Sequence, residues 1–193
     1  MFEVTAEVVR DLLDYDPETG VFRWKFRDRK YCESDKSWKI CNTRREGKTA
    51  GTLDKSDGYR RIKIFTKFYK AHRLAWLHYY GEWPSDQIDH VNCIRDDNRI
   101  ENLREATNQQ NGMNSSSQFG TSQYKGVCWD KHRNKWQAQI GINGKLKKLG
   151  RFEIEIEAAR AYDRAAIEHF GIYAKLNFPI EDYLDYIEEL EAA

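Results

Sequence analysis

The chain has 193 residues, and its 32 Lys and Arg against 31 Asp and Glu leave a formal net charge of only +1. Hydrophobic residues make up 40% of it, which is enough for one ordinary domain or two small ones. Because the sequence has no apolar run of membrane-spanning length and no signal-peptide pattern, we expect a soluble, cytoplasmic protein without a membrane partner. Its four cysteines form no Cys-x-x-Cys pair and are expected to be free thiols.

The near-zero net charge conceals strong segregation of charge along the chain. Residues 21–80 carry 17 basic and 6 acidic side chains, and residues 122–179 carry 11 and 6, whereas the remaining segments are acidic. Basic stretches interleaved with aromatic residues are typical of a nucleic-acid surface. Either block alone is as readily a solvated charged face, so charge indicates this partner without deciding it.

The first half of the chain predicts short helices and hairpins. Residues 5–15 form an amphipathic pattern that Thr5 can cap and Asp16-Pro17 can end, and residues 21–26 alternate as a strand. The polar stretch 27–48 indicates a loop or a DNA-facing insertion. Beyond it we expect strands at residues 51–53, 59–64 and 68–70, the first two of which flank an Asp-Gly hairpin turn. A helix should follow at residues 71–80 and end at a glycine.

The most informative motif is Asp89-His90, followed by Asn102 twelve residues after His90 and by Asn111 nine residues further on. An imidazole titrates near neutral pH and can deprotonate water. Carboxylate and amide oxygens suit Mg²⁺ or Mn²⁺. Each residue alone is more often a surface hydrogen-bonding group or a helix cap, and the joint spacing is what favours a one-metal phosphodiesterase site. A further histidine, His72, is interpreted as structural.

Residues 86–114 resemble the HNH homing-endonuclease family of the phage type, and the likeness continues through residues 70–76 and 81–84. The resemblance implies a ββα-metal (His-Me finger) core at about residues 70–115. By position, His90 would be the general base and Asn102 the catalytic-site residue that braces the hairpin loop. Asp89 and Asn111 would hold one Mg²⁺ or Mn²⁺. The implied reaction is phosphodiester hydrolysis that leaves 5′-phosphate and 3′-hydroxyl ends.

The second half predicts a compact sheet with one helix. A polar, serine- and glycine-rich linker is expected at 116–121. Three short strands follow, of which the last two are joined by an Asn143-Gly144 turn, and an amphipathic helix should end at Gly171. We expect the three strands at residues 124–127, 135–140 and 147–152. The amphipathic helix should occupy residues 154–170, and an acidic terminal helix should occupy residues 180–193.

Residues 122–179 resemble the APETALA-two/ethylene-response-factor (AP2/ERF) DNA-binding family through residues 124–127, 149–152, 157–163 and 177–179. The resemblance implies a three-stranded antiparallel sheet in the major groove, supported by one packed helix. Cys128 and Asp130 stand where plant members usually carry Arg, so no target sequence is transferred. The residues that the resemblance places on the DNA face are Lys125, Trp129, Lys131, Arg133, Lys135, Gln137, Gln139, Lys147 and Arg151.

These patterns predict an α+β protein with an HNH nuclease module at 1–115 and an AP2/ERF-like domain at 122–179. The first hypothesis is a metal-dependent, site-specific endonuclease acting on double-stranded DNA, in the host bacterial cytoplasm if phage-encoded, with no obligatory protein partner. The second is a DNA-binding transcriptional regulator that carries a degenerate nuclease fold. An RNA-processing nuclease is a weaker third. Plasmid cleavage with and without EDTA distinguishes the first two.

Overall fold

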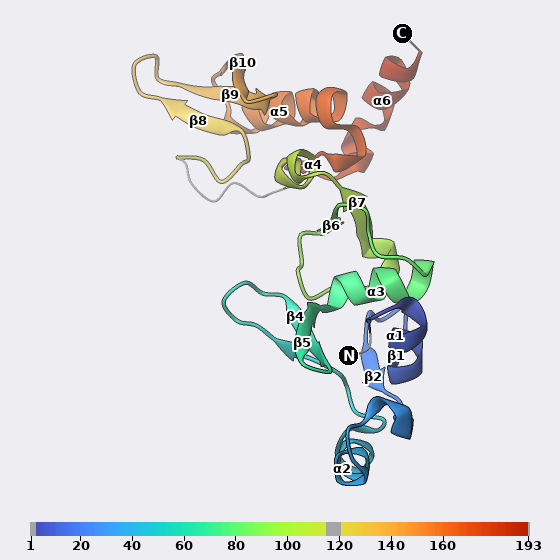
Figure 1. Ribbon diagram of the computed structural model, residues 1–193. Helices are drawn as coiled ribbons and strands as arrows, with labels where there is room; N and C mark the ends of the chain where they lie inside the picture. The colour runs from blue at the N-terminus through green and yellow to red at the C-terminus, as the bar shows by residue number, and fades with distance from the viewer. Residues whose placement is uncertain (1–2, 115–120, 193) are drawn as a thin grey trace. The chain divides into compact units, whose positions relative to one another are not determined.

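The computed structural model describes residues 3–114 and 121–192, so the predicted linker at 116–121 lies outside the described residues except for its last position. The chain divides into two compact units, Met1–Asn108 and Gln109–Ala193, both drawn in Figure 1. Each mixes helices with small sheets, and the strand pairs among the described residues are antiparallel. The prediction of an α+β fold is confirmed at this level. Within the described ranges, no helix has the length and apolar character needed to cross a bilayer.

The first unit alternates short helices with short strands. Its helical elements are α1 (Ala6–Leu12), η1 (Arg29–Tyr31), α2 (Asp35–Arg45), α3 (Ala71–Tyr80) and η2 (Ile100–Asn102). Its strands are β1 (Leu13–Tyr15), β2 (Phe22–Trp24), β3 (Thr52–Leu53), β4 (Arg60–Ile64), β5 (Lys67–Lys70), β6 (Gln87–His90) and β7 (Leu103–Ala106). They form the sheets β1–β2, β3–β4–β5 and β6–β7.

Helix α1 is shorter than its sequence pattern predicts. The Thr5 side chain caps it as expected, but the helix ends at Leu12, not at Tyr15. Leu13 and Tyr15 are buried while Asp14 between them is exposed. An alternation of period two therefore overrides the helical stripe at this end and directs the chain into β1.

The polar segment 27–48 contains the unexpected helix α2. Its N-terminus is closed by a capping box between Ser34 and Ser37. None of its residues is buried. Sequence periodicity missed this helix because the segment lacks the apolar stripe that such predictions depend on.

Helix α3 forms the centre of the core of the first unit. It occupies the predicted range and ends at Gly81, whose φ is 90°. Leu74, Ala75 and Leu77 are at most 1% exposed and belong to the same buried cluster as side chains of α1, β1, β2 and β4. The Tyr15 hydroxyl donates to the Asn98 carbonyl oxygen over 2.7 Å, which ties β1 to the loop that precedes η2.

The second unit is a sheet covered by one long helix. Its strands are β8 (Val127–Asp130), β9 (Lys135–Ile142) and β10 (Lys145–Phe152), in the order β10–β9–β8. Its helical elements are α4 (Asn108–Met113, whose first residue belongs to the first unit), α5 (Glu155–Phe170), η3 (Gly171–Tyr173), η4 (Ile180–Tyr183) and α6 (Leu184–Glu191). The helix predicted at 154–170 and the turn at Asn143-Gly144 are confirmed.

The first strand of this sheet begins later than predicted, at Val127 instead of Tyr124. Gly126 has a φ of 76°, and a Cβ atom there would lie 1.9 Å from the Tyr162 ring. The backbone therefore turns against α5 at Gly126, and the first residue in register with β9 is Val127, opposite Ala138.

The boundary between the two units falls after Asn108, the first residue of α4, whereas the sequence predicted it after residue 115. Gln109 Nε2 donates to Asn143 Oδ1 over 3.1 Å, and Met113 packs against the cluster that contains Ile140 and Phe170. These contacts assign most of α4 to the second unit.

Candidate functional site

Three of the four residues predicted to form a metal site lie on the β6–β7 hairpin and its loop. Asp89 and His90 end β6, and Asn102 ends η2. Their exposed fractions are only 4%, 4% and 5%. Asn111, the fourth residue, lies on α4 in the second unit. The described fold thus joins the first three in one hairpin of the first unit, and Asn111 is not part of it.

The Asp89 carboxylate is already paired. Strand register places it opposite Arg104, which donates from Nε and Nη2 to Asp89 Oδ2 over 2.9 and 2.6 Å. The two side chains are 5% and 16% exposed, so the ion pair is largely removed from water. A divalent cation at this carboxylate would meet the positive charge of the guanidinium group. As paired with Arg104, the Asp89 carboxylate does not fit the role of a Mg²⁺ or Mn²⁺ ligand, and the ligand role of Asn111 stays a prediction.

His90 is packed among aromatic rings. Its ring centroid lies 4.9 Å from that of His72, nearly perpendicular to it, and Tyr59 lies 5.0 Å from His72. Burial lowers the pKa of His90, and burial followed by the neighbouring His90 lowers the pKa of His72 to about 3. Both imidazoles are therefore neutral near pH 7. The two rings thus pack against each other in the first unit, and the structural role interpreted for His72 stays a prediction.

Asn102 organises the loop between β6 and η2. Its Nδ2 donates to the Asp97 carbonyl oxygen over 2.8 Å, and its Oδ1 accepts the backbone N–H of Asn92 over 2.9 Å. The Arg99 guanidinium group, bonded to the Asp97 carboxylate, lowers the pKa of Asp97 to about 2. These bonds define the shape of the loop without leaving the Asn102 amide exposed.

In the second unit, the β8–β10 sheet has one face covered by α5. Ala138 and Ile140 of β9 are 0% and 2% exposed and belong to the clusters formed with α5. Directly opposed residues of antiparallel strands lie on the same face of the sheet. The strand register therefore shows on which face each residue of β8 and β10 lies. The opposite face carries no helix among the described residues, and we call it the open face. Its side chains are Cys128, Asp130, Lys135, Gln137, Gln139, Leu146, Lys148 and Arg151.

The nine residues predicted to contact DNA separate into groups. Lys135, Gln137, Gln139 and Arg151 lie on the open face, and Lys131 and Arg133 lie in the turn between β8 and β9. Trp129 and Lys147 are opposed to Trp136 and Ile140, which assigns them to the covered face. The Lys125 ammonium group donates back to a carbonyl oxygen of α4. Contrary to the prediction, Trp129, Lys147 and Lys125 are not on the open face.

Lys148 belongs to the open face, and sequence reasoning missed it. Counting by twos from Arg151 selects Lys147, but the register shifts by one residue between Lys148 and Gly150. This β-bulge exchanges the faces of the two lysines. In agreement, Lys147 Nζ lies 3.4 Å from His169 Nε2 on α5. A glycine inside a strand pattern is the signal that could have predicted the bulge.

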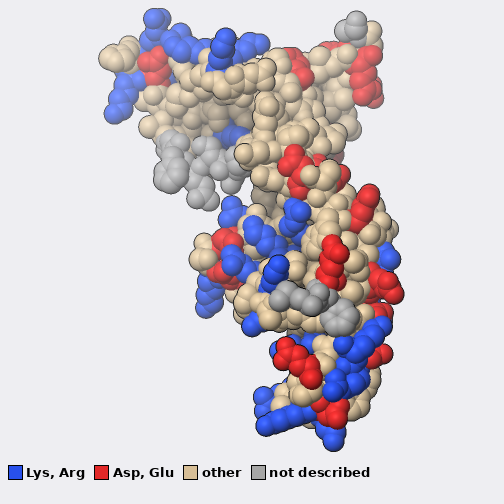
Figure 2. Space-filling view, viewed as in Figure 1, with Lys and Arg blue, Asp and Glu red and all other residues tan. Residues whose placement is uncertain are grey.

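An ion pair crosses the middle of the open face. Arg151 Nε donates to Asp130 Oδ2 over 2.9 Å, and β9 lies between their strands, so the pair passes over β9. On β9, Gln137 is only 9% exposed and donates to Gln139 Oε1 over 3.1 Å. The hydrogen bond from Arg151 lowers the pKa of Asp130. Figure 2 shows Lys and Arg gathered over the surface of this sheet.

Two family models match separate segments of the chain. The HNH endonuclease model matches residues 69–113, and the AP2 domain model matches residues 122–171. The first match covers the β6–β7 hairpin, and the second covers the sheet and α5. The chain thus contains one segment similar to each family.

The similar proteins include several plant transcription factors. Ethylene-responsive transcription factor WRI1 of Arabidopsis thaliana is 32% identical over 123 residues, which cover 60% of this chain and 28% of that protein. AP2-like ethylene-responsive transcription factor PLT2 of the same species is 31% identical over 185 residues, covering 93% and 32%. APETALA2-like protein 2 of Oryza sativa subsp. japonica is 41% identical over 70 residues, covering 36% and 16%. The chain spans less than half the length of each.

The prediction of a metal-dependent DNA endonuclease is wrong. The similar proteins carry the names of transcription factors, and the match to PLT2 extends over 93% of the chain, so it reaches well into the first unit. The pairing of Asp89 with Arg104 and the burial of His90 agree with this correction, because a general base must reach the water that it activates. The HNH match stands as a domain similarity, and these relatives give no support to a phage origin.

Proposed function

We propose that the protein is a DNA-binding transcriptional regulator that contacts duplex DNA through the open face of the β8–β10 sheet. The transcription-factor names of its relatives support this class. The observation that carries the proposal is the strand register, which gathers Lys148 and Arg151 with Gln137 and Gln139 on the face opposite α5. The major groove of DNA is wide enough to admit β-strands that present such side chains.

The residue types on this face suit both parts of DNA recognition. A guanidinium group such as that of Arg151 can donate two hydrogen bonds to a guanine, and the amide of Gln139, to which the buried Gln137 donates, can pair with an adenine edge. Lys131 and Arg133 in the β8–β9 turn are exposed and suited to phosphates. We assign base reading to β9 and β10, and positioning on the DNA backbone to the turn between β8 and β9.

The first unit, in this proposal, carries a degenerate nuclease fold. The HNH match and the β6–β7 hairpin followed along the chain by α4 support a relationship to the ββα arrangement. The ion pair of Asp89 and the buried ring of His90 support a structural role for the former motif. The cytoplasmic location stays a prediction.

A matched pair of double variants tests the DNA-binding face. Lys148→Gln with Arg151→Gln removes two positive charges from the open face, and Lys145→Gln with Lys147→Gln removes two from the covered side of the same strand. On duplexes selected from a random pool by the full chain, the first variant should raise Kd by about tenfold or more, since a bidentate base contact contributes about 1–3 kcal/mol. The second should change Kd little. Equal losses in both would contradict the assignment of the face.

Incubation with supercoiled plasmid tests the class of protein. The full chain with Mg²⁺ or Mn²⁺ should shift the mobility of the plasmid and leave it uncut. Nicked or linear plasmid that disappears with EDTA and with His90→Ala would overturn the regulator proposal.

A further inference from the structure

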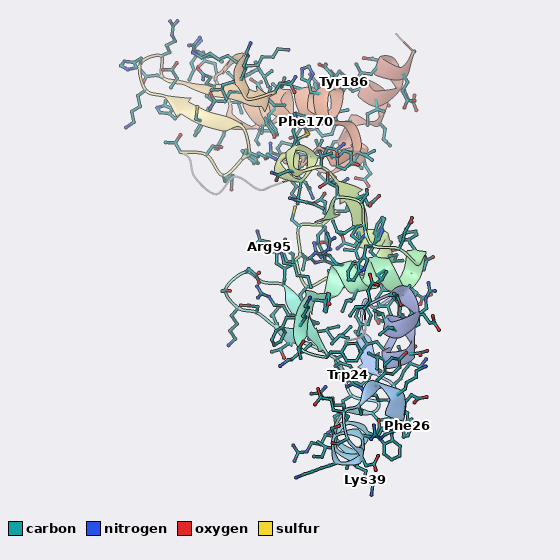
Figure 3. All side chains as sticks on the ribbon, in the orientation of Figure 1. Trp24, Phe26, Lys39, Arg95, Phe170 and Tyr186 are labelled. Atoms are coloured by element: carbon teal, nitrogen blue, oxygen red, sulfur yellow. The ribbon has the colours of Figure 1, made fainter. Side chains whose placement is uncertain are left out.

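Helix α2 of the first unit presents a row of cations that has no structural task within the described fold. Lys36, Lys39 and Arg44, here called the outer row, are exposed and recur at helical spacing on one side of the helix. None of the three has an acidic partner among residues 3–114 and 121–192. Figure 3 shows Lys39 at the outer side of α2, directed into solvent.

The opposite side of α2 is fixed to the first unit by directed bonds. Trp38 Nε1 and Asn42 Nδ2 both donate to the Arg27 carbonyl oxygen, over 2.8 and 3.1 Å, and Asn42 Oδ1 accepts the Arg27 N–H over 2.8 Å. After the helix, the chain returns beside β2, where the Trp24 N–H donates to the Lys48 carbonyl oxygen over 2.9 Å. An isolated helix of 11 residues is marginal in water, so these bonds hold α2 in place and define which side faces out.

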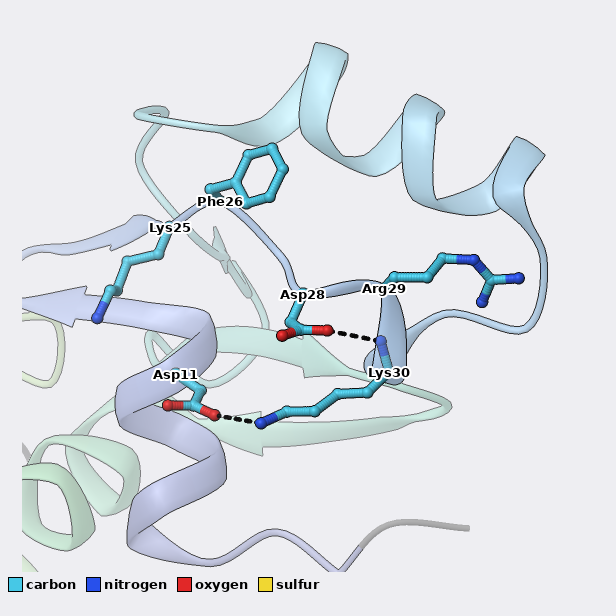
Figure 4. A pocket seen from close by; sticks show the side chains of 6 residues that line it. All are labelled: Asp11, Lys25, Phe26, Asp28, Arg29 and Lys30. Atoms are coloured by element: carbon cyan, nitrogen blue, oxygen red, sulfur yellow. Dashed lines mark hydrogen bonds and ion pairs between the residues drawn. The ribbon is translucent and has the colours of Figure 1, made fainter.

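Acidic residues at the base of the helix neutralise the cations there but not the outer row. The hollow drawn in Figure 4 is lined by Asp11, Lys25, Phe26, Asp28, Arg29 and Lys30. Lys30 Nζ lies 3.2 Å from the Asp11 carboxylate, and Arg29 is paired with Asp35. In this hollow Lys30 and Arg29 have acidic partners and Lys25 donates to the Arg10 carbonyl oxygen over 2.9 Å, whereas the cations of the outer row have no such partner among the described residues.

From this contrast we infer that the outer row of α2 binds the phosphate backbone of duplex DNA as a second contact surface, separate from the open face. The inference rests on the proposed DNA-binding function. Lys36 and Arg44 are eight residues apart, so their Cα atoms lie about 12 Å apart along the helix axis. Separately, the major groove of DNA is wide enough to admit an α-helix. Lysine ammonium groups are point charges that suit phosphates. The contact therefore adds affinity without sequence preference.

A triple variant, Lys36→Gln, Lys39→Gln and Arg44→Gln, tests the outer row in the full chain. Its matched control, Lys55→Gln, Lys63→Gln and Lys67→Gln, removes the same charge from exposed positions of the first unit outside α2. Kd is measured against salt concentration on a selected duplex and on an unrelated duplex. The outer-row variant should raise Kd by the same factor on both. It should also reduce the slope of log K against log salt by about 2.7, or about 0.9 for each lost phosphate contact.

The possible outcomes separate this inference from the proposed function. If the outer-row variant keeps the wild-type slope while Lys148→Gln with Arg151→Gln loses binding, the α2 contact is wrong and the proposed function stands. An equal change of slope in the control triple would also overturn the contact, because general charge would then explain it. The contact would likewise be overturned if the outer-row variant lost affinity for structured RNA but kept its affinity for duplex DNA. A wild-type chain that binds no duplex would overturn both. Unchanged circular dichroism shows that each variant is folded.

Discussion

Asp163 and Asn177 form a clasp that closes the second unit. The Asn177 backbone N–H lies 2.9 and 3.0 Å from the two carboxylate oxygens of Asp163, and Asn177 Nδ2 donates to Oδ1 over 3.0 Å. The Phe178 N–H and the Tyr183 hydroxyl also donate to Oδ2. Asn177 in turn bonds the backbone N–H and carbonyl oxygen of Lys125. One buried carboxylate thus connects α5 to the segment that follows it and to the start of the sheet.

Replacement of this carboxylate should destabilise the second unit. Asp163 is 0% exposed, and although burial raises its pKa, its donors favour the charged form. In Asp163→Asn, an amide group replaces an acceptor-only carboxylate and leaves donors of Asn177 and Tyr183 without acceptors. We expect a loss of about 3 kcal/mol in the free energy of unfolding, measured by urea denaturation. The control Asp182→Asn breaks an exposed ion pair with Arg160 and should cost less than about 1 kcal/mol. Similar losses in the two variants would contradict the clasp.

A second prediction concerns the contact between Gly126 and Tyr162. Gly126→Ala places a Cβ atom 1.9 Å from the ring, in addition to the strain of a φ of 76°. Gly144→Ala has a similar φ of 74° but meets nothing within 4 Å, so it isolates the conformational cost of about 1 kcal/mol. Gly126→Ala should therefore lower Tm well below that of Gly144→Ala. Equal Tm values would show that the ring moves away without cost.

Sequence periodicity predicted the second unit well where the information is local. The stripe of α5 recurs at helical spacing, and Ala159, Tyr162 and Ala166 on it are at most 3% exposed. The same method failed for α2, because a helix held by side-chain bonds to a distant backbone carries no apolar period. It failed again at Lys148, because a bulge changes the face without changing the alternation of residue types.

The candidate site of the first unit shows a different limit. Asp89, His90 and Asn102 have the spacing of an HNH motif, and the fold brings them into one hairpin. What spacing cannot predict is the partner of each group. Arg104 reaches Asp89 only because β6 and β7 pair in that register, and His72 meets His90 only through tertiary packing. A motif predicts which residues gather, whereas burial and pairing decide what they do.

The third prediction follows from the ion pair on the open face. Asp130→Asn removes a negative charge from the proposed DNA surface and releases Arg151. Affinity for every duplex should rise several-fold at low ionic strength, and the gain should shrink as salt screens the charges. Asp182→Asn, which makes the same charge change outside the face, should leave Kd unchanged. A weaker Kd for Asp130→Asn would mean instead that Asp130 holds Arg151 in its binding geometry.

The fourth prediction concerns acid stability and the histidines of the first unit. Burial lowers the pKa of His72 to about 3 and also lowers those of His90 and His78, from an ordinary value of 6.5. Above pH 6.5 both the folded and the unfolded chain hold these groups neutral. Below it the unfolded chain takes up protons that the folded chain does not, so stability falls as pH falls, by up to about 1.4 kcal/mol per pH unit for each buried histidine.

This window is separable from that of Asp97 and the other carboxylates whose pKa is lowered. Asp97, with its pKa lowered to about 2, contributes stability that is lost only below the ordinary value of 3.8. Between pH 6.5 and 5, the urea midpoint should therefore decline mainly through the histidines. His72→Gln removes one titrating group and should flatten that decline, whatever its effect on stability at pH 7. A variant whose midpoint falls as steeply as the wild type would show that His72 does not titrate below its ordinary pKa.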